Sequence, residues 1–419
     1  MPTPAKKIFF TEDSTVILLG FSIIILSILG VLLPTPSFGW QTSNDLLTKV
    51  LAYDNIVKIL VLLLAVLTCA IIGALALGKP VVPLLAGIPV IFVLTMLALI
   101  IAGNNKVKNL NLEAVIFSLL IGLVIGNTVQ LPLWLKKSLS TEVFVKIGLV
   151  ILGTSVIFSD ILQAGLLGLI QALVVVVSVW YFAFWVSKKL GIDEEMAIML
   201  SSAVSICGVS AAIATSGAIK GDSKKLSYVI SLVLITAIPM MIFMPYIAKA
   251  LGLSEEVTGA WLGGTIDTTG AVVASGTLVG EVALKTSTIV KFSQNVLLGV
   301  AAFAISIYWT YTNNPLAKDN ETKPSLTVIW DRFPKFVLGF LAASLLFSFF
   351  VPADTINAVK GSLKNLQGLW FALAFTSIGL ETNFRDIFNK DNKKPLYAFL
   401  IAQTFNIFIT LIIAYYLFR

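Results

Sequence analysis

The chain has 419 residues, of which 58% are hydrophobic and only 12% are charged, and its formal net charge is +7. This composition is typical of a polytopic membrane protein and argues against a water-soluble core. The basic residues lie between apolar runs, where they orient membrane spans, so we expect no binding of nucleic acid.

Apolar runs of about 20 residues predict an all-α membrane protein with about 13 transmembrane spans and no separate soluble domain. The first run follows Lys6 and Lys7, but it is long for a signal-peptide core and no cleavage site follows it. We therefore expect it to be retained. The expected spans are residues 15–33, 56–78, 81–103, 113–127, 142–158, 162–187, 195–219, 226–249, 256–279, 286–311, 335–351, 366–384 and 395–418.

The Lys and Arg residues between these spans predict the orientation. More of them fall on the side that holds the N-terminus, including Lys79, Lys136 and Lys137. Because basic loops stay in the cytoplasm, we expect a cytoplasmic N-terminus and an outer C-terminus. The expected location is the bacterial inner (plasma) membrane.

Inverted repeats are common in secondary transporters, and the spans allow such a division. Peripheral helices within 1–112 precede one five-span repeat at 113–250 and a second at 255–419. In this register the fourth spans, 195–219 and 366–384, are both rich in Ser, Thr and Gly. We predict that these two helices are discontinuous and form a binding site together.

Two shorter similarities do not fit this register. The segment Leu190–Glu195 (LGIDEE) resembles Leu251–Glu256 (LGLSEE). A second set of matches occurs at a constant offset. Chance similarity between apolar segments explains both equally well. The second set joins Gly153, Phe158, Asp160 and Ile161 to Gly379, Phe384, Asp386 and Ile387.

The first candidate site lies in the uncharged run at 196–219. A break near Gly208 would free backbone N–H groups for an anion, together with the hydroxyls of Ser205 and Ser210. The alternative is close helix packing through small residues. The candidate substrate-binding residues of this run are Ser205, Cys207, Gly208, Val209 and Ser210.

The second candidate is the counterpart in 366–384. Thr376, Ser377 and Gly379 lie deep in the span and are candidate substrate contacts. Glu381 lies nearer its inner end, where it is either a coupling residue or a solvated helix terminus.

The third candidate centres on Asp267, in the middle of a predicted span. An intramembrane carboxylate is costly unless it is paired or hydrated, so Asp267 is the leading coupling residue. Thr268 and Thr269 are positioned to bind it or the substrate. Its alternative role is a structural buried pair.

Lys291 is the natural partner of Asp267 and stands just inside the next span, where it would compensate charge or bind an anion. The alternative is a side chain that reaches the outer surface. Gln294 and Asn295 follow one turn later and are further candidate coupling residues.

Enzyme motifs are missing from the sequence. It has no phosphate-binding loop and no hydrolase nucleophile elbow. There is no histidine, and Cys69 and Cys207 are far apart, so we expect no metal centre and no cofactor. Any coupling would use sodium ions or protons and carboxylates.

From about residue 113 onward, the chain resembles the YeiH-like membrane proteins, which are grouped as a sulfate exporter family. The resemblance implies a fold related to bile-acid symporters and sodium–proton antiporters. That fold has two crossed discontinuous helices and often an elevator-like motion, and from it we expect a homodimer. The matching motifs are Ile121–Thr128 (IGLVIGNT), Leu149–Gly153 (LVILG), Ser205–Ala211 (SICGVSA), Gly263–Asp267 (GGTID), Val272–Gly276 (VVASG) and Ile378–Leu380 (IGL).

The chain also departs from that family pattern. Many relatives carry a His-Glu or His-Asp pair followed by Gln, where this chain has Ile266-Asp267 and then Thr268. Relatives also often carry an Arg near the position of Gln294. The substrate or the coupling ion is therefore expected to differ from theirs.

Together these features predict a secondary active transporter of a small anion, such as sulfate or an organic sulfonate or carboxylate, with export as one direction. A first alternative is a sodium–proton or other cation antiporter that uses Asp267 and Glu381. A second alternative is a membrane receptor or scaffold that transports nothing.

Overall fold

The computed structural model describes residues 10–109, 114–313, 326–382 and 393–419, and the regular secondary structure of this part is helical apart from one isolated bridge between Trp40 and Asn104. Seven helical segments in this part are long and apolar enough to cross a membrane. A polytopic membrane protein is therefore confirmed, whereas the 13 spans stay a prediction. The seven are Tyr53–Ala76, Val82–Ala102, Leu133–Ser155, Phe158–Lys189, Ser223–Ala250, Glu281–Trp309 and Lys394–Phe418.

The chain folds into two compact units, each built from two stretches of sequence. Unit 1 comprises Met1–Phe158 and Lys335–Asn383, and unit 2 comprises Ser159–Pro334 and Phe384–Arg419. These units do not coincide with the repeats expected at 113–250 and 255–419, because each unit contains residues from both expected repeats. The inverted relation between the repeats stays a prediction.

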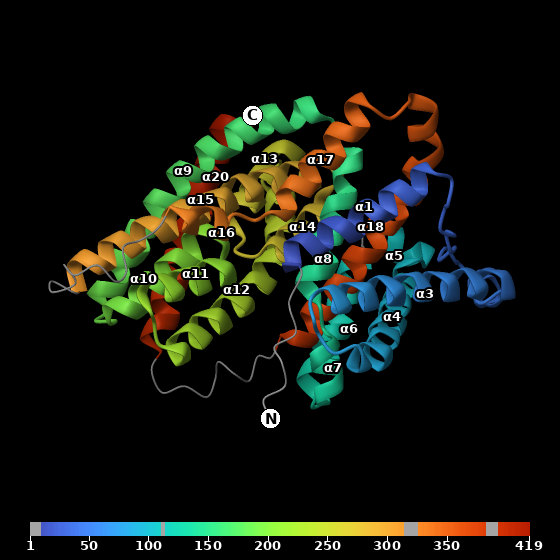
Figure 1. The fold of residues 1–419 in the computed structure, drawn as a ribbon, viewed down its shortest axis with the longest axis horizontal. Coiled ribbons are helices and arrows are strands. Elements are labelled where there is room, and N and C mark those ends of the chain that lie inside the picture. Colours follow the sequence, from blue (N-terminus) through green and yellow to red (C-terminus); the bar gives the residue numbers. More distant parts are fainter. Residues whose placement is uncertain (1–9, 110–113, 314–325, 383–392) are drawn as a thin grey trace. The chain divides into compact units, whose positions relative to one another are not determined.

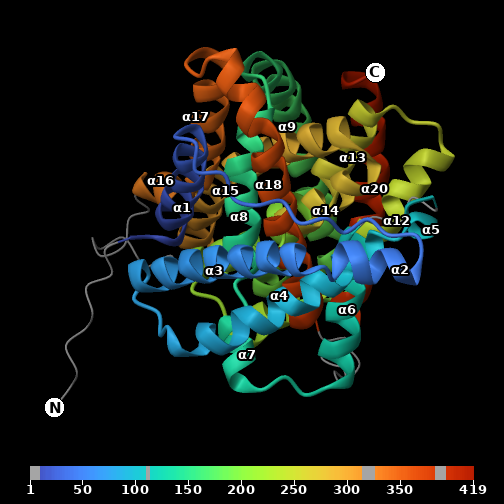
Figure 2. The ribbon, with the colours of Figure 1, turned by 90° about the vertical axis from the view of Figure 1, so that its right-hand side faces the viewer.

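In unit 1, α18 packs against both α6 and α8, and α3 packs against α4 (Figure 2). A π-helical turn at Leu46–Val50 connects α2 to α3, and a 3-10 turn at Gly153–Ser155 follows α8. The helices of unit 1 are α1 (Glu12–Ile28), α2 (Ser43–Asp45), α3 (Tyr53–Ala76), α4 (Val82–Ala102), α5 (Asn105–Asn109), α6 (Ala114–Thr128), α7 (Leu133–Ser138), α8 (Thr141–Leu152), α17 (Phe336–Phe349) and α18 (Ala353–Glu381).

The helix α18 is continuous, so the break predicted within 366–384 is wrong over 366–381, and residues 383 and 384 lie outside the described residues. Thr376 and Ser377 explain the error. Their hydroxyls donate to the carbonyls of Ala372 and Leu373, one turn earlier, at 3.0 and 2.9 Å. Both side chains are thus satisfied inside an intact helix.

Unit 2 contains two interrupted helices, which Figure 1 shows as the separate segments α10 and α11, and α13 and α14. A π-helical turn at Ala203–Cys207 follows α10. The helices of unit 2 are α9 (Phe158–Lys189), α10 (Glu194–Ser202), α11 (Val209–Ile219), α12 (Ser223–Ala250), α13 (Glu255–Thr265), α14 (Thr269–Val279), α15 (Glu281–Asn313), α16 (Thr327–Arg332) and α20 (Lys394–Leu417).

The two interrupted helices begin in the same way. Gly191 and Gly252 both have positive φ, at 71° and 67°, and end the preceding helix. Asp193 then accepts from the Met196 amide at 3.1 Å, and Ser254 caps α13 in the same manner. The segments LGIDEE and LGLSEE therefore form matching helix starts.

Ion pairs join the starts of α10 and α12. Lys225 Nζ lies 2.6 Å from Asp193 Oδ1 and 2.7 Å from Glu195 Oε2. Asp222 caps α12, and hydrogen bonds from the backbone amides of Lys225 and Lys224 hold the pKa of its carboxyl below the ordinary value. Burial is the largest influence on the pKa of Asp193 and raises it, but the hydrogen bonds from Lys225 and the Met196 amide, together with the charge of Lys225, outweigh burial and leave that pKa lowered.

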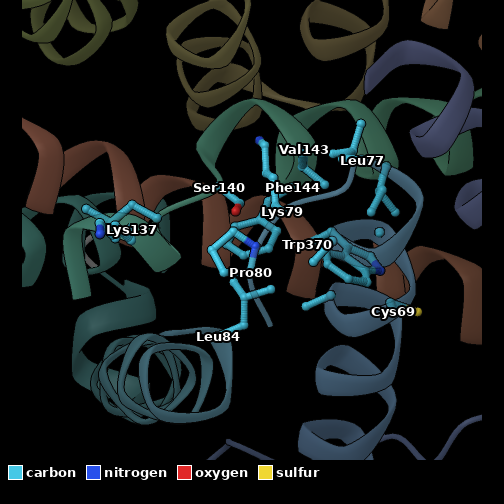
Figure 3. Close-up of a pocket in the computed structure, with 15 residues that line it drawn as sticks. Cys69, Leu77, Lys79, Pro80, Leu84, Lys137, Ser140, Val143, Phe144 and Trp370 are labelled. Carbon is cyan, nitrogen blue, oxygen red and sulfur yellow. The ribbon is translucent and has the colours of Figure 1, made fainter. Parts of the chain in front are cut away.

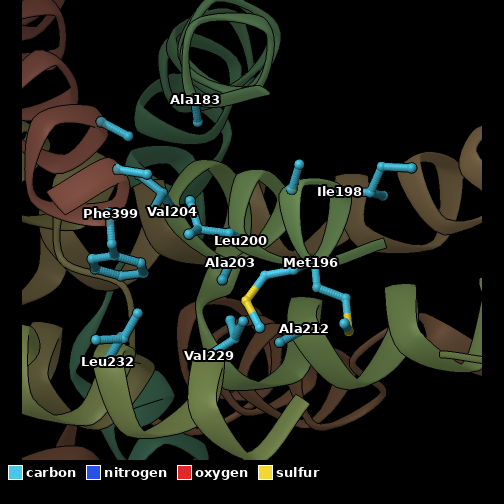
Figure 4. Close-up of a cluster of buried hydrophobic side chains, with 14 of the residues drawn as sticks. Ala183, Met196, Ile198, Leu200, Ala203, Val204, Ala212, Val229, Leu232 and Phe399 are labelled. Carbon is cyan, nitrogen blue, oxygen red and sulfur yellow. The ribbon is translucent and has the colours of Figure 1, made fainter. Parts of the chain in front are cut away.

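Apolar packing anchors the first half of the interrupted helix α10. Met196 and Leu200 lie among Val229 and Leu232 of α12 and Phe399 of α20 (Figure 4). Within a bilayer such side chains stabilise the structure mainly through close van der Waals packing. The polar segment that follows α10 is thus held by a rigid apolar support.

Candidate functional site: the crossing of two interrupted helices

The first interruption is at Gly208, which has φ 60° and ψ −112°. L-residues with a side chain rarely adopt this conformation. A Cβ atom at this position would also lie 2.6 Å from Val233 Cγ1 and 3.0 Å from the Cβ of Asp267. Both the backbone conformation and the crowding therefore require glycine here.

The second interruption lies at Ile266–Thr268 and replaces the one expected in α18. The helix α13 ends at Thr265, Ile266 is extended, and Thr268 caps α14 by accepting from the Ala271 amide at 3.3 Å. Asp267 occupies the extended connection and is only 2% exposed. The two interruptions meet, because the Asp267 carbonyl oxygen also lies 3.1 Å from the Cβ position of Gly208.

Side chains of α15 donate hydrogen bonds to the backbone carbonyls that end the first half of each interrupted helix, in the π-helical turn after α10 and at the C-terminal end of α13, and so close these ends. Lys291 is 1% exposed and donates to Ile206 O at 3.3 Å and to Gln294 Oε1 at 2.6 Å. The Gln294 amide donates to Ser205 O at 2.8 Å and to Gly264 O at 3.3 Å. Because Gly264 belongs to α13, one glutamine joins both interrupted helices.

Side chains of α20 complete this closure. Asn406 Nδ2 donates to Val204 O at 3.2 Å and to Thr265 O at 3.3 Å, so it also joins both helices. Gln403 Nε2 donates to Thr265 O at 3.0 Å, and Thr410 donates to Asn406 Oδ1 at 2.8 Å. The carbonyls that end a helix normally lack partners, and here they have buried donors.

Lys291 and Asp267 were expected to pair. Within the described residues, no ion pair of 4 Å or less joins them. Lys291 contacts the end of the first interrupted helix, where a positive charge opposes the negative end of the helix dipole. The predicted interaction is thus a longer-range one, and both charges remain inside the same buried cluster.

Several buried oxygen atoms at the crossing have no hydrogen-bond partner among the residues that the structure describes. Buried polar groups without partners are rare and often mark the place of an ion or a water molecule. Oxygen ligands of this kind suit a hard cation. The atoms are Asp267 Oδ2, Asn295 Oδ1, Ser205 Oγ, Thr265 Oγ1 and Gln403 Oε1.

The N-terminal ends of the second halves, α11 and α14, are more exposed than the C-terminal ends of the first halves. Ser210 is exposed, and Val209, Thr268 and Thr269 are half-buried. Asn295 Nδ2 donates to Thr269 Oγ1 at 3.3 Å and fixes this residue. The first N–H groups of a helix have no partner within it, so the starts of α11 and α14 offer donors to an anion.

The remaining sequence candidates belong to unit 1 and have other partners. Thr376 Oγ1 lies 2.9 Å from Thr95 Oγ1. A Cβ atom on Gly379 would lie 2.5 Å from Leu119 O, so this glycine permits close packing of α18 on α6. Glu381 is exposed at the end of α18. These positions belong to unit 1, whereas the cluster around Asp267 is built from residues of unit 2.

Sequence reasoning missed the residues of α20. Gln403, Asn406 and Thr410 follow one another at helical spacing within an otherwise apolar span. Polar side chains of this kind inside a membrane helix usually face the protein interior. This stripe was the available signal, as was the LGLSEE segment before α13.

A family model described as "Conserved hypothetical protein 698" matches residues 86–398. No solved structure matches the chain.

Proteins described as UPF0324 membrane proteins are similar to the chain. One from Rhodopirellula baltica is 43% identical over 352 residues, covering 82% of this chain and 64% of the relative. One from Nitratidesulfovibrio vulgaris is 38% identical over 365 residues, covering 83% and 62%. One from Nitrosomonas europaea is 32% identical over 320 residues, covering 68% and 64%. The chain spans less than two thirds of the length of these relatives.

Proposed function

Since the chain belongs to the UPF0324 family of membrane proteins, we propose that it is an ion-coupled secondary transporter of a small anion. The observation that carries this proposal is the meeting of two interrupted helices at Gly208 and Asp267. Transporters use such helices because the freed peptide groups bind ions within the membrane.

The anion binds at the starts of α11 and α14 in this proposal. The N–H groups beside Val209, Ser210 and Thr269 supply donors at the positive ends of two helix dipoles. Lys291 adds a buried positive charge to the same cluster. Sulfate, a sulfonate or a carboxylate has the charge and the acceptor oxygens that this arrangement suits.

Coupling is assigned to the carbonyl side of the crossing. Asp267 supplies the negative charge, and the unpartnered oxygens of Asn295, Ser205 and Thr265 complete a place for a sodium ion or a proton. Gln294 has both ends of its amide engaged by protein groups, so its role is to position the backbone. The anion and its coupling ion thus occupy adjacent places, which the hydrogen bond from Asn295 to Thr269 connects.

The setting of this transport is part of the proposal. The protein acts as a homodimer in the bacterial inner membrane, with the N-terminus in the cytoplasm. One unit moves against the other in an elevator-like manner, and the imposed gradients decide between uptake and export.

A cation antiporter is the second candidate, and the unpartnered oxygens favour it. If Asp267 and its neighbours exchange a cation for protons, the starts of α11 and α14 would bind no substrate. Lys291 would then serve only to oppose the charge of the helix end.

Flux measurements distinguish the two candidates. The purified protein is reconstituted in liposomes, and labelled sulfate, a sulfonate and a carboxylate are each followed with and without sodium or pH gradients. We expect gradient-driven anion flux that Ser210→Leu abolishes and that the matched variant Thr376→Val in unit 1 preserves. Sodium-dependent proton movement with no anion flux would instead establish the antiporter.

A further inference from the structure

Unit 1 contains a cavity of about 290 Å³, and none of the residues that line it belongs to the proposed transport site. Its walls come from α3, α4, α7, α8 and α18. Figure 3 shows Leu84, Phe144 and Trp370 among the apolar side chains that surround it, together with Lys79 and Lys137. The proposed anion transport does not use this cavity.

The wall of the cavity combines two kinds of chemistry. Most lining side chains are hydrocarbon or aromatic, and the polar ones include Lys79, Lys137 and the Ser140 hydroxyl. Both lysines are exposed, and neither forms an ion pair within the described parts of the chain. A hollow with this lining suits a ligand that has an anionic end and an apolar end.

The two lysines come from different connections of the chain. Lys79 lies between α3 and α4, and Lys137 lies at the end of α7. The sequence assigns both connections to the cytoplasmic side, and the fold places both lysines around one cavity. Basic pockets between helices at this face of a membrane attract the headgroups of anionic lipids.

We propose that this cavity binds an anionic phospholipid of the surrounding bilayer. The two ammonium groups and Ser140 hold the phosphate, and the apolar wall holds the adjoining part of one acyl chain. The volume is near the lower limit of ligand pockets, so the cavity encloses only part of the lipid. A soluble anion would leave the apolar wall unmatched.

Cys69 provides a direct reporter, because it lines the cavity and is only partly buried. The rate of its alkylation by a maleimide is measured on the full chain in neutral detergent. We expect added phosphatidylglycerol to slow this reaction severalfold, and phosphatidylcholine or inorganic phosphate to leave it unchanged. Cys69→Ser reports the background from Cys207.

The lysines are tested together as Lys79→Gln/Lys137→Gln. Since each contributes to phospholipid attraction, we expect half-maximal protection of Cys69 to need roughly 30-fold more phosphatidylglycerol. Lys136→Gln is the matched control, because this lysine lies beside Lys137 and does not line the cavity. Thermal unfolding confirms that each variant is folded.

Three results would overturn the proposal. Equal protection by phosphatidylcholine would show that charge plays no part. Protection by inorganic phosphate alone would assign the cavity to a soluble anion. An unchanged phosphatidylglycerol requirement in the double lysine variant would remove these residues from any headgroup site. None of these results bears on transport at Asp267.

Discussion

Gly208 and Asp267 are in direct van der Waals contact, since a Cβ atom on the glycine would lie 3.0 Å from the Cβ of the aspartate. Each residue occupies the interruption of its own helix. The position of the buried carboxylate is therefore fixed by the conformation of the other helix, and a change at Gly208 acts on both.

Gly208→Ala is expected to destabilise the protein by about 2 kcal/mol or more. A backbone conformation outside the regions that residues with a side chain usually adopt costs about 1–3 kcal/mol, and Val233 and Asp267 must also shift. Thermal unfolding measures the loss. Gly368→Ala in α18 is the control, because no atom lies within 4 Å of its Cβ position and alanine favours a helix by about 0.5–1 kcal/mol. Equal stability of Gly208→Ala and the parent would contradict the conformation.

Asp267→Asn is expected to remove the dependence of anion flux and thermal stability on the coupling ion. If sodium is that ion, a concentration 100 times its Kd would stabilise the parent by about 2.7 kcal/mol, and the variant would lose this gain. Unfolding in sodium chloride and in choline chloride provides the comparison. Glu381→Gln should retain the full sodium effect. If sodium stabilises Asp267→Asn as much as it stabilises the parent, Asp267 does not bind the coupling ion.

Asn406→Leu is expected to destabilise the protein by about 2–4 kcal/mol. It removes the donor to Val204 O and one of two donors to Thr265 O, and buried groups left without partners cost about 1–3 kcal/mol each. Chemical or thermal unfolding tests this. Thr404→Val on the same helix should change stability by less than about 0.5 kcal/mol, because Thr404 is exposed. Similar effects of both variants would argue against the closure of the helix ends.

Gly379→Ala tests the assignment of α18 to packing. Its Cβ would lie 2.5 Å from Leu119 O and 2.7 Å from Leu123 N, so we expect a loss of about 1–3 kcal/mol with unchanged anion preference. Gly361→Ala on the same helix has free space and should be tolerated. A changed order of transported anions in Gly379→Ala would return this segment to the binding site.

The lowered pKa of Asp222 leads us to expect that the protein loses stability at acidic pH. The pKa of its carboxyl is lower in the folded protein than in the unfolded chain, so it contributes stability that is present above about pH 4 and is lost as the pH falls through the folded value. Asp222→Asn keeps a helix cap and should reduce this acid sensitivity with little effect at pH 7. Unfolding temperatures between pH 6 and 3 measure it. Identical profiles would show that the carboxylate contributes nothing.

The membrane class, the unusual conformation at Gly208 and the burial of Asp267 and Lys291 all follow from local signals in the sequence. The second interruption does not follow from such local signals. Ile266–Thr268 has neither glycine nor proline, so it depends on contacts with Gln403 and Asn406 that lie far along the chain. Conversely, the Ser and Thr residues of α18 suggested a break, although their hydroxyls bond within the helix.

The expected pairing of 195–219 with 366–384 as two discontinuous helices is wrong over 366–381 for a related reason. Counting spans in a uniformly apolar sequence does not distinguish an interrupted helix from a continuous one. The capping residues at Asp193 and Ser254 mark the correspondence between the interrupted helices instead. Caps are set by local chemistry, and they identify equivalent elements more reliably than span numbering in uniformly apolar sequence.

The donors from α15 and α20 have a kinetic consequence. Since Lys291, Gln294, Gln403 and Asn406 already hold the peptide groups around the crossing, an arriving ion meets a framework that needs little rearrangement. Such preorganisation spares the entropy of ordering loops during each turnover. Discrimination between ions would then depend on how well the radius of each ion fits the fixed oxygen positions. Ions of the same charge but different radius would therefore differ more in binding affinity than in the rate at which they bind.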